Sequence, residues 1–95
     1  MKTEYIPDVM NRLLAAREIA EDYANGIHGH GPSVAGYGAK LMIDGLAEQH
    51  DDNDFIAGFH ATTTIIESLL FNPKISTAQR AAYRAIYRAL IKTDR

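Results

Sequence analysis

The sequence predicts an all-α protein, folded as an antiparallel four-helix bundle. Apolar side chains recur every three or four residues in four successive segments, the period of an amphipathic helix. Breaks rich in Gly, Pro, Asn and Asp separate these segments. The connections are short, and short connections favour antiparallel neighbours. A chain of 95 residues forms one domain with a single modest core.

We expect the first helix at about 7–25 and the second at about 34–49. Pro7 suits a first helical turn, and Asn25-Gly26 suits a helix end. The apolar positions of the first segment are Val9, Met10, Leu13, Leu14, Ala16, Ala20 and Tyr23. Ser33 can cap the second helix, whose expected apolar face is Val34, Tyr37, Leu41, Met42 and Leu46. Three glycines inside that helix weaken it but can admit a close helix neighbour: Gly36, Gly38 and Gly45.

The third helix is expected at about 54–71, with Asn53 or Asp52 as its N-cap. The run 62–66 is β-branched and locally favours a strand, but helical spacing on both sides outweighs it. Asn72-Pro73 ends this helix. The apolar positions are Phe55, Ile56, Phe59, Ile66, Leu69 and Leu70.

The fourth helix is expected at about 77–92. Ser76 and Gln79 have the spacing of a capping box. A narrow alanine seam, flanked by Tyr83, Ile86 and Leu90, is made of Ala78, Ala82, Ala85 and Ala89. A basic stripe drifts across the opposite side, formed by Arg80, Arg84, Arg88 and Lys92.

Composition and charge exclude or disfavour several classes of function. The chain has no cysteine, which excludes disulfides and thiolate metal sites. Its first residues predict no signal peptide, and no apolar run approaches the ~20 residues that span a bilayer, so we expect a cytoplasmic protein. The net charge is −2, with −6 in residues 1–75 and +4 in residues 76–95. An acidic majority disfavours nucleic acid as the partner.

The candidates for metal chemistry are histidines and carboxylates. Side chains that can bind Zn²⁺ occur at His28, His30 and His50, and His50 adjoins the acidic turn 51–54. Their spacing is not that of a helical zinc site. Paired carboxylates could hold Mg²⁺, as in all-α nucleotide pyrophosphohydrolases, and the acidic residues in question are Glu18, Glu21, Asp22, Asp44 and Glu48. Their spacing does not match that family's motifs. The glycine-rich segment 26–38 fits neither phosphate-binding motif. We therefore expect no enzyme activity, no metal and no cofactor.

The basic stripe is the best-formed surface feature. It is either the solvated side of a packed helix or a docking surface for an acidic protein or anionic headgroups, with peripheral membrane contact as one form. Tyr and Arg are enriched in protein interfaces. The predicted partner-binding residues are Arg80, Tyr83, Arg84, Tyr87, Arg88 and Lys92.

The layout from about Leu41 to Ile91 resembles the bacteriocin immunity proteins of lactic acid bacteria, of the enterocin A and pediocin immunity type. The similarity lies in the order and spacing of "LAEQHDDNDFIAGF", "SLLFNPKIST" and "AQRAAYRAIYRAL". It implies a small cytosolic four-helix bundle without catalytic activity. It also implies protection of the cell by binding, from the cytosolic side, the complex of a bacteriocin with its sugar-transporter receptor. In that family the C-terminal half sets which bacteriocin is recognised.

Two other functions remain open from the residues. One is a small phage-type inhibitor of a host protein, a class that also tends to be helical and free of catalytic motifs. The other is the metal-dependent nucleotide hydrolase. The chain can be a monomer or a homodimer, since its alanine and glycine seams can close within one bundle or between two.

Overall fold

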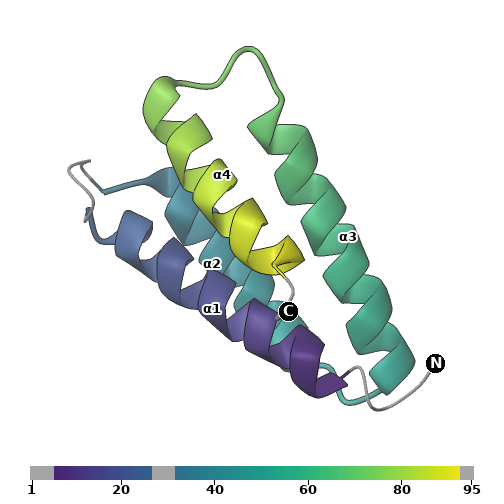
Figure 1. The fold of residues 1–95 in the computed structure, drawn as a ribbon. Coiled ribbons are helices and arrows are strands. Elements are labelled where there is room, and N and C mark those ends of the chain that lie inside the picture. The colour runs from purple at the N-terminus through teal and green to yellow at the C-terminus, as the bar shows by residue number, and fades with distance from the viewer. Residues whose placement is uncertain (1–5, 27–31, 93–95) are drawn as a thin grey trace.

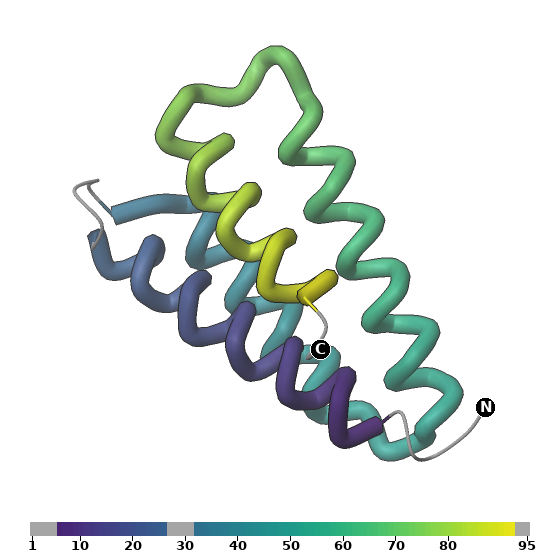
Figure 2. Tube along the Cα trace, in the orientation of Figure 1, coloured from purple at the N-terminus to yellow at the C-terminus, as the bar shows by residue number. Residues whose placement is uncertain are grey.

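The computed structural model describes residues 6–26 and 32–92, and these contain four helices and no strand. The helices are α1 (Ile6–Ala24), α2 (Val34–Ala47), α3 (Asp52–Leu70) and α4 (Thr77–Ile91) (Figure 1). Their bounds agree with the predicted ranges to within two residues. Successive helices run in opposite directions along the tube trace (Figure 2), which confirms the antiparallel four-helix bundle.

The helix ends follow the local sequence closely. Gly26 takes a positive φ of 86° at the end of α1, as the Asn25-Gly26 pair predicts. The Ser33 hydroxyl accepts a hydrogen bond from the Gly36 amide, so Ser33 is the N-cap of α2. Ser76 and Gln79 form the predicted capping box of α4.

The predicted cap of α3, Asn53 or Asp52, was wrong by two residues or by one. The N-cap is Asp51, whose carboxylate accepts a hydrogen bond from the Asp54 amide at 3.0 Å. Asp52 and Asp54 then lie in the first turn, where negative charge interacts favourably with the helix dipole. The β-branched run 62–66 is helical, and the Thr63 hydroxyl donates to the Phe59 carbonyl at 2.9 Å.

In the bundle, α4 lies between α1 and α3, while α2 packs along α1 (Figures 1 and 2). The main core draws residues from all four helices: Val9, Leu13, Ala16, Ala20, Ala39, Ile43, Leu46, Phe55, Ile56, Phe59, Ile66, Ile86, Ala89 and Leu90. The alanine seam of α4 is buried inside the bundle at Ala82 and Ala89, but Ala78 is exposed. That seam therefore closes within one chain. No helix among the described residues is both long enough and apolar enough to cross a membrane.

The apolar face predicted for α2 was largely wrong, because the helix is rotated about its axis. Val34, Tyr37 and Leu41 are exposed, and only Leu46 of the predicted face is fully buried. The buried face carries smaller residues: Ala35, Gly36, Ala39, Ile43 and Leu46. Small side chains on this face allow α2 to approach α1 closely, and the three larger side chains are left on the outside.

Gly36 is where α1 and α2 come closest. A Cβ at this position would lie 2.6 Å from the Ala24 nitrogen, 2.7 Å from the Ala20 carbonyl oxygen and 2.9 Å from the Tyr23 Cβ. Any side chain at this position would therefore push the two helices apart. Gly38 and Gly45 face open space, with no atom within 4 Å of an added Cβ. Of the three glycines expected to admit a neighbouring helix, only Gly36 does so within this chain.

Candidate functional site

The six residues of the predicted binding surface fall into two groups. Arg80 belongs to the first group, because its guanidinium is tied to the end of α3. It donates hydrogen bonds to the carbonyl oxygens of Leu70 at 2.5 Å and Asn72 at 3.1 Å. Carbonyls at a helix C-terminus lack partners within their own helix, so an arginine from another element satisfies them well. Arg80 thus fastens the start of α4 to the end of α3.

The two tyrosines also belong to the first group. Tyr83 is half-buried against the core, and this burial raises the pKa of its phenol. The Tyr87 hydroxyl donates a hydrogen bond to the Glu67 carboxylate at 2.7 Å. That hydrogen bond raises the pKa of Tyr87, because it holds the phenolic proton in place. Both rings hold α4 in position and leave only part of their surface outside.

The second group consists of Arg84, Arg88 and Lys92. All three are exposed, and none has an ion pair or hydrogen bond to another described residue. Arg84 and Arg88 lie one turn apart on the outside of α4, and Lys92 follows as the C-cap of that helix. We call these three residues the α4 basic face.

Apolar surface borders the α4 basic face. A groove of about 270 Å³ lies between the end of α3 and α4, lined by Leu70, Phe71, Arg80, Arg84, Tyr87, Arg88 and Ile91. Phe71 is 70% exposed and Ile91 is 46% exposed, so both leave apolar surface in water beside these cations. Unpaired cations beside exposed aromatic and aliphatic groups have the composition of a protein-binding surface.

Arg12 is a residue that the sequence analysis overlooked. It lies where α1, α3 and the end of α4 meet, and it lines two grooves of about 360 and 450 Å³. Its guanidinium pairs with Asp8 at 3.1 Å, donates to the Leu90 carbonyl at 3.2 Å, and sits 5.3 Å from the Phe59 ring centroid. The signal was present in the sequence, because position 12 follows Val9 by three residues and so belongs to the core-facing stripe. Arg12 holds the end of α4 against α1, and Arg80 holds the end of α3 against α4.

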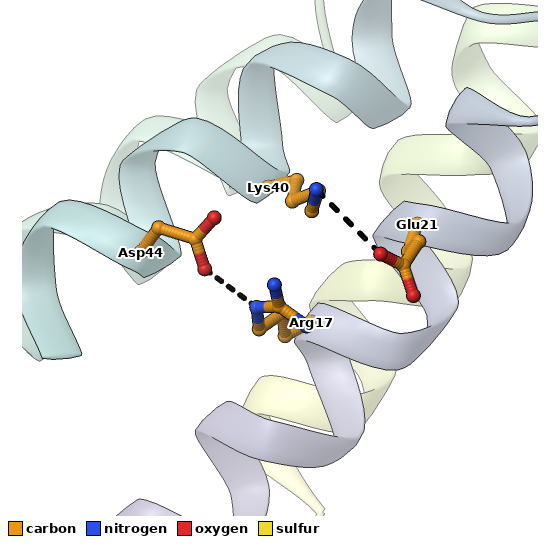
Figure 3. Close-up of polar contacts among 4 residues, drawn as sticks. All are labelled: Arg17, Glu21, Lys40 and Asp44. Carbon is orange, nitrogen blue, oxygen red and sulfur yellow. Dashed lines mark hydrogen bonds and ion pairs between the residues drawn. The ribbon is translucent and has the colours of Figure 1, made fainter.

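Two of the five carboxylates considered as Mg²⁺ ligands form ion pairs between α1 and α2. Asp44 of α2 pairs with Arg17 of α1 at 2.5 Å, and Glu21 of α1 pairs with Lys40 of α2 at 3.5 Å (Figure 3). Each pair joins the two helices in antiparallel register.

The described side chains do not come together in a metal-binding cluster. Within residues 6–26 and 32–92, no three His, Cys, Asp or Glu side chains lie close enough together to hold a metal ion. His50 is exposed in the connection between α2 and α3, and the acidic residues 51–54 form the N-cap and first turn of α3. His28 and His30 fall outside the described residues. The described part of the glycine-rich segment 26–38 ends α1 and begins α2.

Comparison with known proteins supplies no relative for this chain: no family model, no curated protein and no solved structure matches it. The resemblance to immunity proteins is therefore one of layout alone. The functional argument rests on the residues of the α4 basic face and their surroundings.

Proposed function

We propose that this protein acts without catalysis, by docking the α4 basic face on an acidic surface of another protein. The proposal rests on a difference between the residues of α4, some of which contact the rest of the bundle while others do not. Three of the six residues contact other helices of the bundle: Arg80, Tyr83 and Tyr87. The other three are exposed and have no ion pair or hydrogen bond to a described residue: Arg84, Arg88 and Lys92. Cations without an ionic partner among the described residues are available to steer and orient another protein.

The exposed apolar groups beside these cations support a protein as the partner. Phe71 and Ile91 can be covered by a partner's apolar side chains, while Arg84 and Arg88 pair with its carboxylates. An interface with an apolar centre and a charged rim has the composition seen in specific protein complexes. A partner that offered charge alone would leave these apolar groups in water.

The particular role that we propose is immunity to a bacteriocin. The layout resemblance runs from about Leu41 to Ile91, that is from the second half of α2 to the end of α4, and the α4 basic face lies in its last helix. The protein would then act from the cytosolic side, on the complex of a bacteriocin with its sugar-transporter receptor. Its effect would be to protect the cell that makes it.

A survival assay tests this proposal. The chain is expressed in a sensitive strain, which is challenged with a panel of pediocin-like bacteriocins, and an empty vector provides the baseline. We expect raised survival against one or two members of the panel. In those cells, a tagged copy should co-purify with the sugar-transporter receptor only after bacteriocin treatment. Unchanged survival across the whole panel would contradict the immunity role and favour an inhibitor of a host protein.

A further inference from the structure

One of the two grooves that Arg12 lines runs between α1 and α4, which lie side by side in antiparallel directions (Figures 1 and 2). We call it the α1–α4 groove. Its volume of about 360 Å³ lies within the range of small-molecule sites. Its lining residues on α1 extend from Asp8 to Ile19, a rise of about 16 Å along the helix. The groove is therefore long for its volume.

Small side chains keep the α1–α4 groove open. Two packed helices leave a furrow above their line of contact, which large side chains fill and methyl groups do not. The furrow here is bordered by alanines from both helices: Ala15 of α1, and Ala85 and Ala89 of α4. Ile19, which packs against the core, continues this apolar lining at the end away from Asp8. One end of the groove is therefore apolar.

The other end of the groove is positively charged. Arg12 donates to the Leu90 carbonyl, so the start of α1 lies beside the end of α4, where Arg88 and Lys92 also line the groove. Three cations and one carboxylate among the described lining residues give a net charge of +2. Arg12 and Asp8 pair with each other at 3.1 Å, so this charge belongs to Arg88 and Lys92. Neither of these two has an ion pair with a described residue.

We propose that the α1–α4 groove binds a small amphipathic carboxylate, that is, a single alkyl chain ending in a carboxylate group. The carboxylate would lie between Arg88 and Lys92, and the chain would lie along the alanines toward Ile19. An inorganic anion would leave the apolar lining in water, and a neutral chain would gain nothing from the two cations. An extended chain suits the groove better than a compact ring, because the groove is long for its volume.

Titration of the purified protein with octanoate tests this site, with binding followed by the NMR chemical shifts of the backbone amides. The measurement needs no protein partner, so its result is independent of the proposed immunity role. We expect saturable shifts centred on Ala15, Ala85 and Ala89. Octanol has the same chain with a neutral head, and acetate has the same head without the chain. Both should bind about tenfold more weakly or worse, because each lacks one of the two matching parts.

Two pairs of matched variants locate the site. Ala15→Leu fills the groove with a larger side chain, and Ala61→Leu makes the same change at an exposed helical alanine of α3, outside the groove. Lys92→Gln removes a charge from the groove, and Lys74→Gln removes the charge of an exposed lysine in the connection before α4. All four positions are exposed, so each variant should keep a Tm close to that of the wild type.

We expect Ala15→Leu to abolish the saturable shifts, and Lys92→Gln to weaken octanoate binding about two- to fivefold. Ala61→Leu and Lys74→Gln should bind octanoate as the wild type does. The proposal would be overturned if octanoate gave no saturable shift at the α1–α4 groove, or if octanol bound as tightly as octanoate. Unchanged binding by Ala15→Leu, or an equal loss in Ala61→Leu, would overturn it as well.

Discussion

Replacement of Gly36 by alanine tests the packing that positions α1 and α2. The added methyl group would lie 2.6 and 2.7 Å from backbone atoms of Ala24 and Ala20, where ordinary contacts begin near 3.4 Å. Backbone atoms of a helix cannot rotate aside, so the two helices must separate by several tenths of an ångström. Overpacking of this kind costs about 1–3 kcal/mol, and the higher helix propensity of alanine offsets about 1 kcal/mol. We expect Gly36→Ala to lower the free energy of unfolding by up to about 2 kcal/mol.

Gly45→Ala is the matched control, because it makes the same chemical change in the same helix with no atom within 4 Å of the new Cβ. It should raise the free energy of unfolding by about 0.5–1 kcal/mol. Urea unfolding followed by circular dichroism, on dilute protein, would separate the midpoints of the two variants by about 0.5–2 M. If Gly36→Ala proved as stable as Gly45→Ala, the close approach of α1 and α2 at Gly36 would be refuted.

Three further predictions concern α4. Arg80→Ala should lower the free energy of unfolding by about 1–2 kcal/mol, because it removes both hydrogen bonds to the end of α3, whereas Arg84→Ala should stay within about 0.5 kcal/mol of the wild type in the same urea titration. Reversing both charges with Arg84→Glu and Arg88→Glu should leave the Tm nearly unchanged, and a large loss would show that these residues pair within the fold. Stability should also depend on alkaline pH, because the Glu67 hydrogen bond raises the pKa of Tyr87 in the folded protein. Its contribution is complete below about pH 10, the ordinary tyrosine pKa, and is lost as the pH rises through the raised value. The stability difference between the wild type and Tyr87→Phe should therefore shrink above that pH, and a difference that stays constant would contradict the role of this hydrogen bond.

The helices could be predicted from the sequence because their signals are local. Ser76 and Gln79 lie three residues apart and cap α4 through bonds that depend on little else. Gly26 ends α1 because glycine takes a positive φ without strain. Even the β-branched run 62–66 was assigned correctly, since the apolar spacing on either side of it is helical.

The rotation of α2 could not be predicted, because both of its sides are apolar. One side offers Val34, Tyr37 and Leu41, and the other offers alanines with Ile43 and Leu46. Hydrophobicity alone favours burying the larger set. The choice depends on whether a glycine lies opposite the α1 backbone, and that is a property of the helix pair.

The division of the basic stripe has a similar origin. Arg80 and Arg84 look alike in sequence, each one helical turn from the next basic residue. They differ because the chain between α3 and α4 brings the carbonyls of Leu70 and Asn72 next to Arg80. Which arginines remain available for a partner therefore depends on where a different helix ends, and a helical period carries no information about that.

The most direct test of the proposed function is a survival assay in cells that carry matched charge reversals. Arg88→Glu alters the α4 basic face. Lys74→Glu makes the same change in charge at another exposed cation, in the connection before α4, whose side chain has no hydrogen bond or ion pair to other described residues. At equal protein levels, we expect the wild type and Lys74→Glu to protect against the same bacteriocin, and Arg88→Glu to lose most of that protection. Full protection by Arg88→Glu would contradict the assignment of the α4 basic face as the docking surface.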